Sequence, residues 1–307
     1  DSTREPQVKI ILLRQEACDK LFVVINHMIS DGCGFKDYLY LLANLYTQCE
    51  KNSYKSFNKK SLQKRNFAQI SHNFSIKSRW RILSSKTELS MPPDSFQFPL
   101  NGNPDNPTAI VIDIEKEYFD KIRKYAKSND TSINNIVIAA YLREIRRIMK
   151  TPDVMISCPV DLRRYKKKGQ TCGICNLTGL YNCAINISEE ETFKETLDKV
   201  TSQMQAQKAS TNCLKMPLIF DMMYHLLPFS MIKDMLCKRR LTPFISYTNL
   251  GIIDDKRLCF GSHIIEKVFI PTSIKNNPYF QLSVSTFKGC CTLSSCLFAS
   301  EEDVTFA

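Results

Sequence analysis

The sequence predicts an α+β fold, with helices in its middle and short β-strands gathered towards its end. The chain has 307 residues, 43% of them hydrophobic, which is enough for one large domain or two lobes. Its apolar positions change from helical spacing to short strand-like runs, and it contains no internal repeats. A regular βαβ winding therefore fits less well than α+β. No apolar run approaches the roughly 18–20 residues of a membrane helix.

The first predicted elements are a hairpin and a helix. Residues 8–14 and 21–26 have strand composition, and the short polar segment between them predicts a β-hairpin. Apolar positions from Phe35 onwards recur at helical spacing. Residues 91–107 contain five prolines, the clearest connector signal in the chain. We expect a first part at residues 1–90, a connector at 91–107 and a second part at 108–307.

The second part is predicted to contain helices first and strands later. A strand at residues 108–114 precedes a helix at 115–128, and a Thr or Ser N-cap opens a helix within residues 131–145. The run "DVMISCPVDL" predicts a buried strand that enters a basic turn. Further helices are expected at 190–208 and 217–238, and further strands at 244–251, 258–265, 267–272, 279–287 and 290–299.

Positive charge is concentrated in one segment. The net charge is +11, and residues 51–87 hold ten Lys or Arg and no acid, which leaves +1 for the remainder. Such a segment can bind an anion, such as nucleic acid, an acidic carrier protein or a phosphorylated cofactor, or it can be a solvated connection. We favour the solvated connection, because the segment matches no nucleic-acid recognition motif.

Cysteine usage favours a reducing compartment. The thirteen cysteines have scattered spacings, and the polar start of the chain does not resemble a signal peptide. We therefore expect free thiols and a cytoplasmic location. Cys172 and Cys175 form a single CxxC pair without the two further ligands that zinc needs, so no metal is expected.

His27 is the residue whose position calls for a functional explanation. It follows the apolar run "LFVVIN" and precedes the turn "SDGCG". A histidine at a strand end can act as a general base, because its ordinary pKa of about 6.5 lies near neutral pH. Asp31 can then orient the ring or brace the turn, and the N–H of Gly32 can stabilise developing negative charge. The alternative is a core histidine beside a turn, and Cys33 as a nucleophile is disfavoured because it lacks an orienting partner.

The stretch "NHMISDG" contains the pattern HxxxDG, which resembles the signature of the CoA-dependent acyltransferase superfamily. That superfamily includes condensation domains of peptide synthetases, alcohol acetyltransferases, polyketide-associated acyltransferases and plant acyltransferases. Three more segments resemble the family in the expected order: a helix at residues 131–145, the element "PVDLRR" at 159–164 and "SYTNLG" at 246–251.

The resemblance implies a two-lobed, chloramphenicol-acetyltransferase-like fold with mixed sheets and a tunnel between the lobes. It implies that His27 removes a proton from the acceptor and that the N–H of Gly32 helps to hold the oxyanion. It also implies an ion pair between Asp31 and Arg163 that fixes the turn. Asn249 is expected near the tunnel.

Two departures from the family pattern bear on function. Condensation domains usually have a second histidine where this chain has Asn26, and no adenylation or carrier segment adjoins the motif. Both points favour a free-standing acyltransferase. The chain starts at Asp1 and has only 26 residues before His27, so we expect a processed or truncated product whose N-terminal lobe is incomplete.

The sequence thus predicts an acyltransferase that moves an acyl group from acyl-CoA to an alcohol or amine, with no permanently bound cofactor. Arg164, Lys166 and Lys167 are candidates for the CoA phosphates, although they can equally be solvated charges. One alternative takes its acyl group from the phosphopantetheine thioester of an acidic carrier protein. Another is a non-catalytic family member that acts as a binding module. Neither a membrane nor a nucleic acid is an expected partner.

Overall fold

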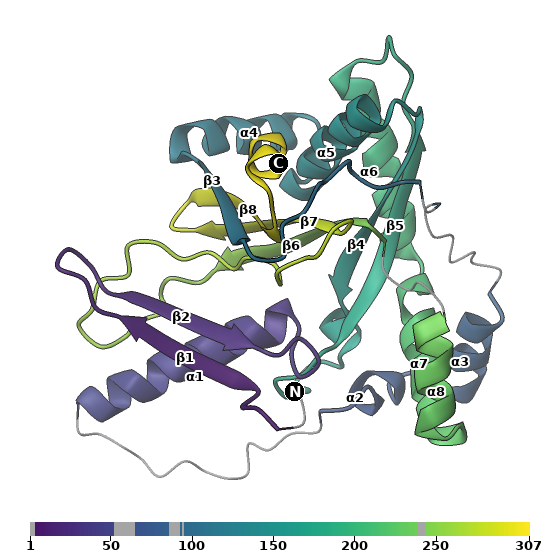
Figure 1. Ribbon diagram of the computed structural model, residues 1–307. Coiled ribbons are helices and arrows are strands. Elements are labelled where there is room, and N and C mark those ends of the chain that lie inside the picture. The colour runs from purple at the N-terminus through teal and green to yellow at the C-terminus, as the bar shows by residue number, and fades with distance from the viewer. Residues whose placement is uncertain (1–3, 52–64, 86–92, 94, 239–242) are drawn as a thin grey trace. The chain divides into compact units, whose positions relative to one another are not determined.

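The computed structural model in Figure 1 describes residues 4–51, 65–85, 93, 95–238 and 243–307. Its backbone contacts divide the chain into two compact units. Unit 1 comprises residues 1–75, 161–178 and 254–266, and unit 2 comprises residues 76–160, 179–253 and 267–307. The boundary between the units falls after residue 75, and two later segments return to pack with the start of the chain. Residue composition can indicate a linker, but it cannot show which later segments pack against the start of the chain.

Unit 1 begins with a β-hairpin, as predicted. Strand β1 (Val8–Leu13) pairs antiparallel with β2 (Lys20–Ile25), with Val8 opposite Ile25. Much of the apolar surface of the hairpin is exposed, including Ile10, Phe22 and Val24. A two-stranded sheet is marginally stable alone, so unit 1 depends on the helix that follows and on the polar contacts of the intervening turn.

Helix α1 (Gly32–Glu50) starts directly after that turn, with Asp31 as its N-cap. The start is three residues earlier than the apolar spacing from Phe35 indicated, because a helix N-terminus is defined by its cap rather than by its apolar face. Returning residues of unit 1 dock on this helix. The guanidinium of Arg257 lies 4.0 Å from the ring centroid of Tyr40, and the backbone N–H of Asp254 donates to the Tyr40 hydroxyl.

Unit 1 also contains the short helix α2 (Ala68–Ser71) and the 3₁₀ turn η2 (Leu162–Tyr165). Asn73, just after α2, donates to the backbone carbonyl of Tyr165 and to the Gln170 side chain, and Gln170 donates back to the Gln69 carbonyl. Phe74 packs edge-on against Tyr165. These contacts hold the basic turn predicted after residue 162 against α2.

Unit 2 is built on a six-stranded mixed sheet with the order β3-β8-β7-β6-β4-β5. Strand β8 pairs antiparallel with both β3 and β7, whereas β6 runs parallel to both β7 and β4. The strands are β3 (Pro107–Ile114), β4 (Asp153–Asp161), β5 (Thr178–Asn186), β6 (Ile245–Ile253), β7 (Phe280–Phe287) and β8 (Cys290–Phe298). A mixed sheet confirms the predicted α+β class.

Helices α4 (Lys116–Ser128), α5 (Ile133–Met149) and α6 (Phe193–Ala209) lie along one face of this sheet (Figure 1). Helix α5 supplies much of the core, since Ile138, Leu142 and Ile145 are completely buried. Its N-cap is Ser132, within the Thr-Ser pair that the sequence singled out. No helix in the described parts of the chain is both long enough and apolar enough to span a membrane.

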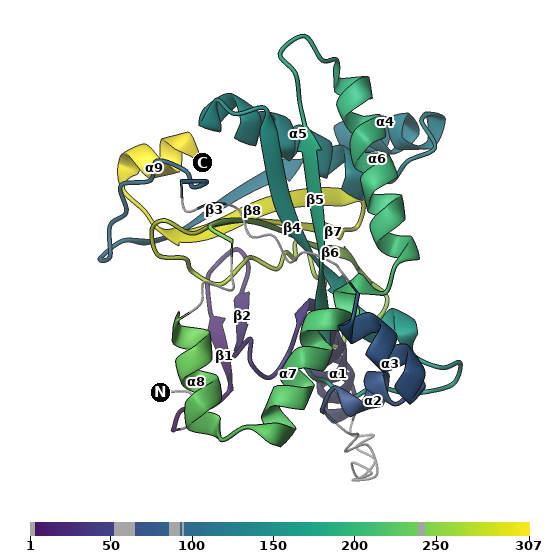
Figure 2. The same ribbon diagram turned by 90° about the vertical axis from the view of Figure 1, so that its right-hand side faces the viewer.

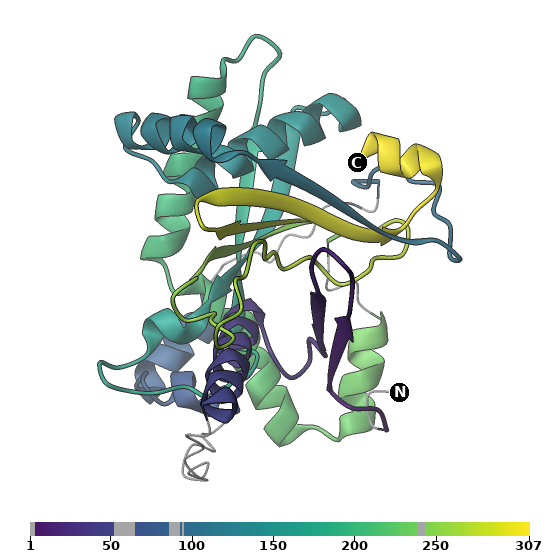
Figure 3. The same ribbon diagram turned by 90° about the vertical axis from the view of Figure 1, so that its left-hand side faces the viewer.

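The other helices of unit 2 are α3 (Ile76–Leu83), α7 (Lys215–Leu226), α8 (Phe229–Lys238) and α9 (Glu301–Phe306). Figure 2 shows α7 and α8 as separate helices joined at a bend, and Figure 3 shows α9 following β8. The prediction of a single helix at residues 217–238 is thus wrong. Pro228 lies at the bend, where its ring cannot continue the helix of the preceding turn.

The strand predictions need three further corrections. Strand β5 was not predicted, because "TGLYNCAIN" mixes small and polar residues with few β-branched ones. Residues 258–265 and 267–272 are not strands; the first contains only an isolated bridge between Phe260 and His263. Their apolar residues satisfied the strand pattern, but composition cannot show whether a partner strand is present.

Candidate functional site

His27 lies in a tight turn between β2 and α1. The backbone N–H of Asn26 donates to the Gln7 carbonyl at 2.9 Å, which continues the hairpin to its end. The Asn26 side chain then accepts from the N–H of Met28 at 2.9 Å and donates to the Gln7 side chain at 2.7 Å. A short amide side chain readily closes such a turn on its own backbone. Asn26 therefore shapes the turn, and the His27 residue within it is exposed.

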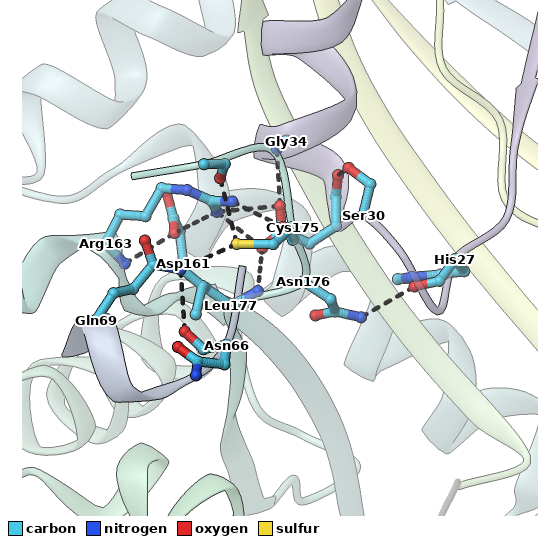
Figure 4. A network of polar contacts seen from close by, with 12 residues as sticks. His27, Ser30, Gly34, Asn66, Gln69, Asp161, Arg163, Cys175, Asn176 and Leu177 are labelled. Carbon is cyan, nitrogen blue, oxygen red and sulfur yellow. Dashed lines mark hydrogen bonds and ion pairs between the residues drawn. The ribbon is translucent and has the colours of Figure 1, made fainter. Parts of the chain in front are cut away.

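Asp31 binds three partners of the polar network, Gly34, Arg163 and Leu177, which Figure 4 labels. Its carboxylate accepts from the N–H groups of Gly34 and Leu177, both at 2.7 Å. It also forms an ion pair with Arg163, whose Nη1 lies 2.8 Å from one carboxylate oxygen and 3.0 Å from the other. None of these bonds comes from the His27 ring. Of the two roles considered for Asp31, the geometry matches bracing of the turn.

Arg163 connects this carboxylate to a separate loop. Its Nη2 donates to the Cys175 carbonyl at 2.8 Å, and its Nη1 also contacts Asp161 at 3.0 Å. The Arg163 and Asp31 side chains are only 10% and 6% exposed. Burial alone would lower the pKa of Arg163, but the hydrogen bond and charge of Asp31 outweigh it and raise that pKa. The guanidinium thus stays charged in the interior, where Asp31 compensates it.

The loop of residues 172–177 completes the network. The Asn176 side chain donates to the His27 carbonyl at 3.1 Å, and Gln69 donates to the Cys175 sulfur at 3.2 Å. Arg65 bridges the two segments, because its Nε donates to the Ile174 carbonyl and its Nη2 to the Ile29 carbonyl. Figure 4 shows the loop beside the turn that carries His27.

Sequence reasoning missed several members of this network. Gly34 is required for packing, since a Cβ there would lie 2.6 Å from the Ser30 hydroxyl and 3.0 Å from the Cys175 carbonyl. The second glycine of "DGCG" was a usable signal for such close approach. Cys175, Asn176 and Leu177 gave no signal, because their contacts with the turn join residues nearly 150 positions apart.

The thiols near the network are not activated. Burial is the main reason that the pKa of Cys33 rises to about 12, and burial also raises the pKa of Cys172 and of Cys175. All three are free thiols. A raised pKa leaves little thiolate near neutral pH, which weakens any nucleophilic role. Among the described residues, no three His, Cys, Asp or Glu side chains are grouped so that they could hold a metal ion.

The remaining predicted site residues lie in two places. In unit 1, Arg164, Lys166 and Lys167 are exposed on η2 and just after it, and the Arg164 guanidinium lies 5.5 Å from the Tyr165 ring centroid. In unit 2, Asn249 is exposed on β6 and donates to the Asn134 side chain at 2.9 Å. Residues 52–64 and 86–87 of the basic segment at 51–87, with five of its ten bases, fall outside the described residues.

The fold and the site together define a class of protein. A model of the condensation-domain family matches residues 1–212, and the chain belongs to that family. This confirms the superfamily indicated by the HxxxDG pattern. A sequence search of curated proteins gave no match.

Solved structures share the fold at low sequence identity. Polyketide synthase associated protein 5 from Mycobacterium tuberculosis has a TM-score of 0.67 at 14% identity, covering 98% of this chain and 74% of that one. A trichothecene 15-O-acetyltransferase from Fusarium sporotrichioides has a TM-score of 0.65 at 12% identity, with 98% and 69% covered.

The epimerization domain from the third module of tyrocidine synthetase B has a TM-score of 0.61 at 16% identity, with 98% and 69% covered. The first condensation domain of the CDA synthetase is covered over 63% of its length. The predicted fold class, α+β and chloramphenicol-acetyltransferase-like, is thereby confirmed.

Proposed function

We propose that the protein is an acyltransferase that moves an acyl group from a CoA thioester to an alcohol or amine, with His27 as the general base. The observation that carries the proposal is the turn between β2 and α1. A buried Asp31–Arg163 pair fixes this turn, and the histidine within it is exposed. Membership of the condensation-domain family supports acyl transfer as the reaction class.

The chemistry requires one base and one oxyanion donor. The acceptor oxygen or nitrogen attacks the thioester carbonyl carbon while the His27 ring takes its proton. When the tetrahedral intermediate collapses, the C–S bond breaks and the leaving thiolate takes that proton from the ring. Gly32 is the first residue of α1, and the first N–H groups of a helix have no partner within the helix. Its N–H is the proposed donor to the oxyanion.

Arg164, Lys166 and Lys167 are proposed to bind the phosphates of CoA. They are exposed, and they belong to the same unit as His27. Arg163, immediately before them, is already committed to Asp31. Arg163 therefore stabilises the turn, whereas the side chains of Arg164, Lys166 and Lys167 are exposed to solvent. Asn249, a further predicted site residue, lies in unit 2, where its contact with Asn134 fixes the side chain.

A carrier-protein donor is the second candidate. Membership of the condensation-domain family favours a carrier-protein donor. Helix α3 also favours it, because Lys77, Arg79 and Arg81 flank an exposed Trp80 there. Acidic carrier proteins complement such a basic surface. Asn26 argues against a carrier-protein donor. This residue closes the turn by hydrogen bonds to Met28 and Gln7, at a position where condensation domains usually have histidine.

The test offers the same acyl group on CoA, on pantetheine and on a carrier protein to the full-length protein, with a panel of alcohols and amines. Mass spectrometry would follow the acylated product, because the thirteen cysteines rule out thiol dyes for detecting free CoA. We expect turnover with acyl-CoA that falls at least 100-fold in His27→Ala, in keeping with removal of a general base. A Lys166→Ala/Lys167→Ala variant should lose activity with acyl-CoA but not with acyl-pantetheine, which lacks the nucleotide phosphates. Turnover on the carrier protein alone would favour the second candidate, and unchanged turnover in His27→Ala would reject both.

A further inference from the structure

The peptide group between His27 and Met28 is held at both of its ends. On one side, the Met28 N–H donates to the Asn26 side chain at 2.9 Å. On the other, the His27 carbonyl accepts from the Asn176 side chain at 3.1 Å. A peptide group is planar, so the two bonds fix its orientation and, with it, the ψ angle of His27.

Asn176 is well placed to supply this bond because its two neighbours are anchored. The Cys175 carbonyl accepts from Arg163, and the Leu177 N–H donates to Asp31. The Leu177 carbonyl also accepts from the Leu162 N–H at 2.9 Å. The loop position of Asn176 is thus set by the same buried ion pair that fixes the far end of the turn.

Arg65 reinforces the connection between the two segments. Its guanidinium donates to the Ile174 carbonyl at 3.0 Å and to the Ile29 carbonyl at 3.1 Å. It therefore spans from two residues before Asn176 to two residues after His27. Of the side chains in this bridge, Asn176 is the one that contacts the residue carrying the imidazole.

We propose that Asn176 is a positioning residue for His27. By fixing the carbonyl of His27 it limits the directions in which the ring can point, and a base must lie within hydrogen-bond reach of the proton that it removes. The proposal rests on the function proposed above for His27. A net hydrogen bond is worth about 0.5–1.5 kcal/mol, so its loss should lower kcat by about 2- to 13-fold.

The test compares three variants of the full-length protein. Asn176→Asp is isosteric, but its carboxylate cannot donate and repels the His27 carbonyl. Asn176→Gln keeps a donor on a longer side chain. Asn186→Asp is the matched control, because Asn186 is an exposed asparagine whose side chain donates to Asp153 in unit 2. Each variant is measured for kcat, KM, melting temperature and the ¹³Cε1 NMR signals of its four labelled histidines.

We expect Asn176→Asp to lower kcat while KM and the melting temperature match those of the control. The His27 signal, assigned from its loss in His27→Ala, should shift or broaden, and the other three should not. Asn176→Gln should recover part of both changes. A His27 signal and kcat that match the control would overturn the proposal. The NMR comparison needs no turnover, so it decides the positioning role even if His27 proves not to be a catalytic base.

Discussion

Replacement of Asp31 by asparagine is the change that most directly tests how this site is held together. The carboxylate serves two N–H donors and one guanidinium at once. The side-chain oxygen of asparagine can still accept from some of these donors. Its NH₂ group, however, would face another donor and cannot accept a hydrogen bond from it. The substitution also removes the charge that compensates Arg163 in a position where that side chain is 10% exposed.

The expected cost is about 3 kcal/mol in the free energy of unfolding of unit 1. Breaking a buried ion pair by removing one partner typically costs about 3–5 kcal/mol. We expect the lower end, because Asp161 remains as a second partner of Arg163. Asp161→Asn is the control, since its side chain is 43% exposed and asparagine can replace aspartate as the N-cap of η2.

Native-state hydrogen exchange is the suitable assay, because it reports the opening free energy of individual amides. The amides of Gly34 and Leu177 donate directly to the Asp31 carboxylate, so they should exchange faster by a factor of about 100 or more in Asp31→Asn. Adding Arg163→Met should recover part of the loss, because the uncompensated charge is then removed. The reasoning is refuted if Asp31→Asn and Asp161→Asn open these two amides equally.

Two smaller predictions concern the same turn. Gly34→Ala should destabilise the protein by about 1–3 kcal/mol in urea unfolding through overpacking, because a Cβ would crowd the Ser30 hydroxyl and the Cys175 carbonyl. Adding Ser30→Ala should relieve part of that cost, and equal stability of the single and double variants would contradict this. Because burial raises the pKa of Cys33 to about 12, its thiol should alkylate slowly at pH 8 and faster as pH rises. Peptide mapping after iodoacetamide treatment should show the exposed Cys18, Cys49 and Cys259 modified first, and early modification of Cys33 would count against the burial.

Local sequence determined much of the secondary structure. The hairpin of β1 and β2, the amphipathic helix α5 with its Ser132 cap and the late strands β7 and β8 follow from periodicity and capping, which act within a few residues. The HxxxDG pattern indicated the superfamily, which the family match confirmed, because such a motif lies within a few adjacent residues.

The tertiary structure alone decided which distant residues complete the turn. Asn176 and Leu177 contact His27 and Asp31 across almost 150 positions of chain, and no periodicity or spacing rule operates at that range. The same holds for the return of residues 161–178 and 254–266 to unit 1. Backbone N–H and carbonyl groups make most of these contacts, and every residue type except proline carries both groups. A sequence can therefore name the histidine, but only the folded chain shows what holds it.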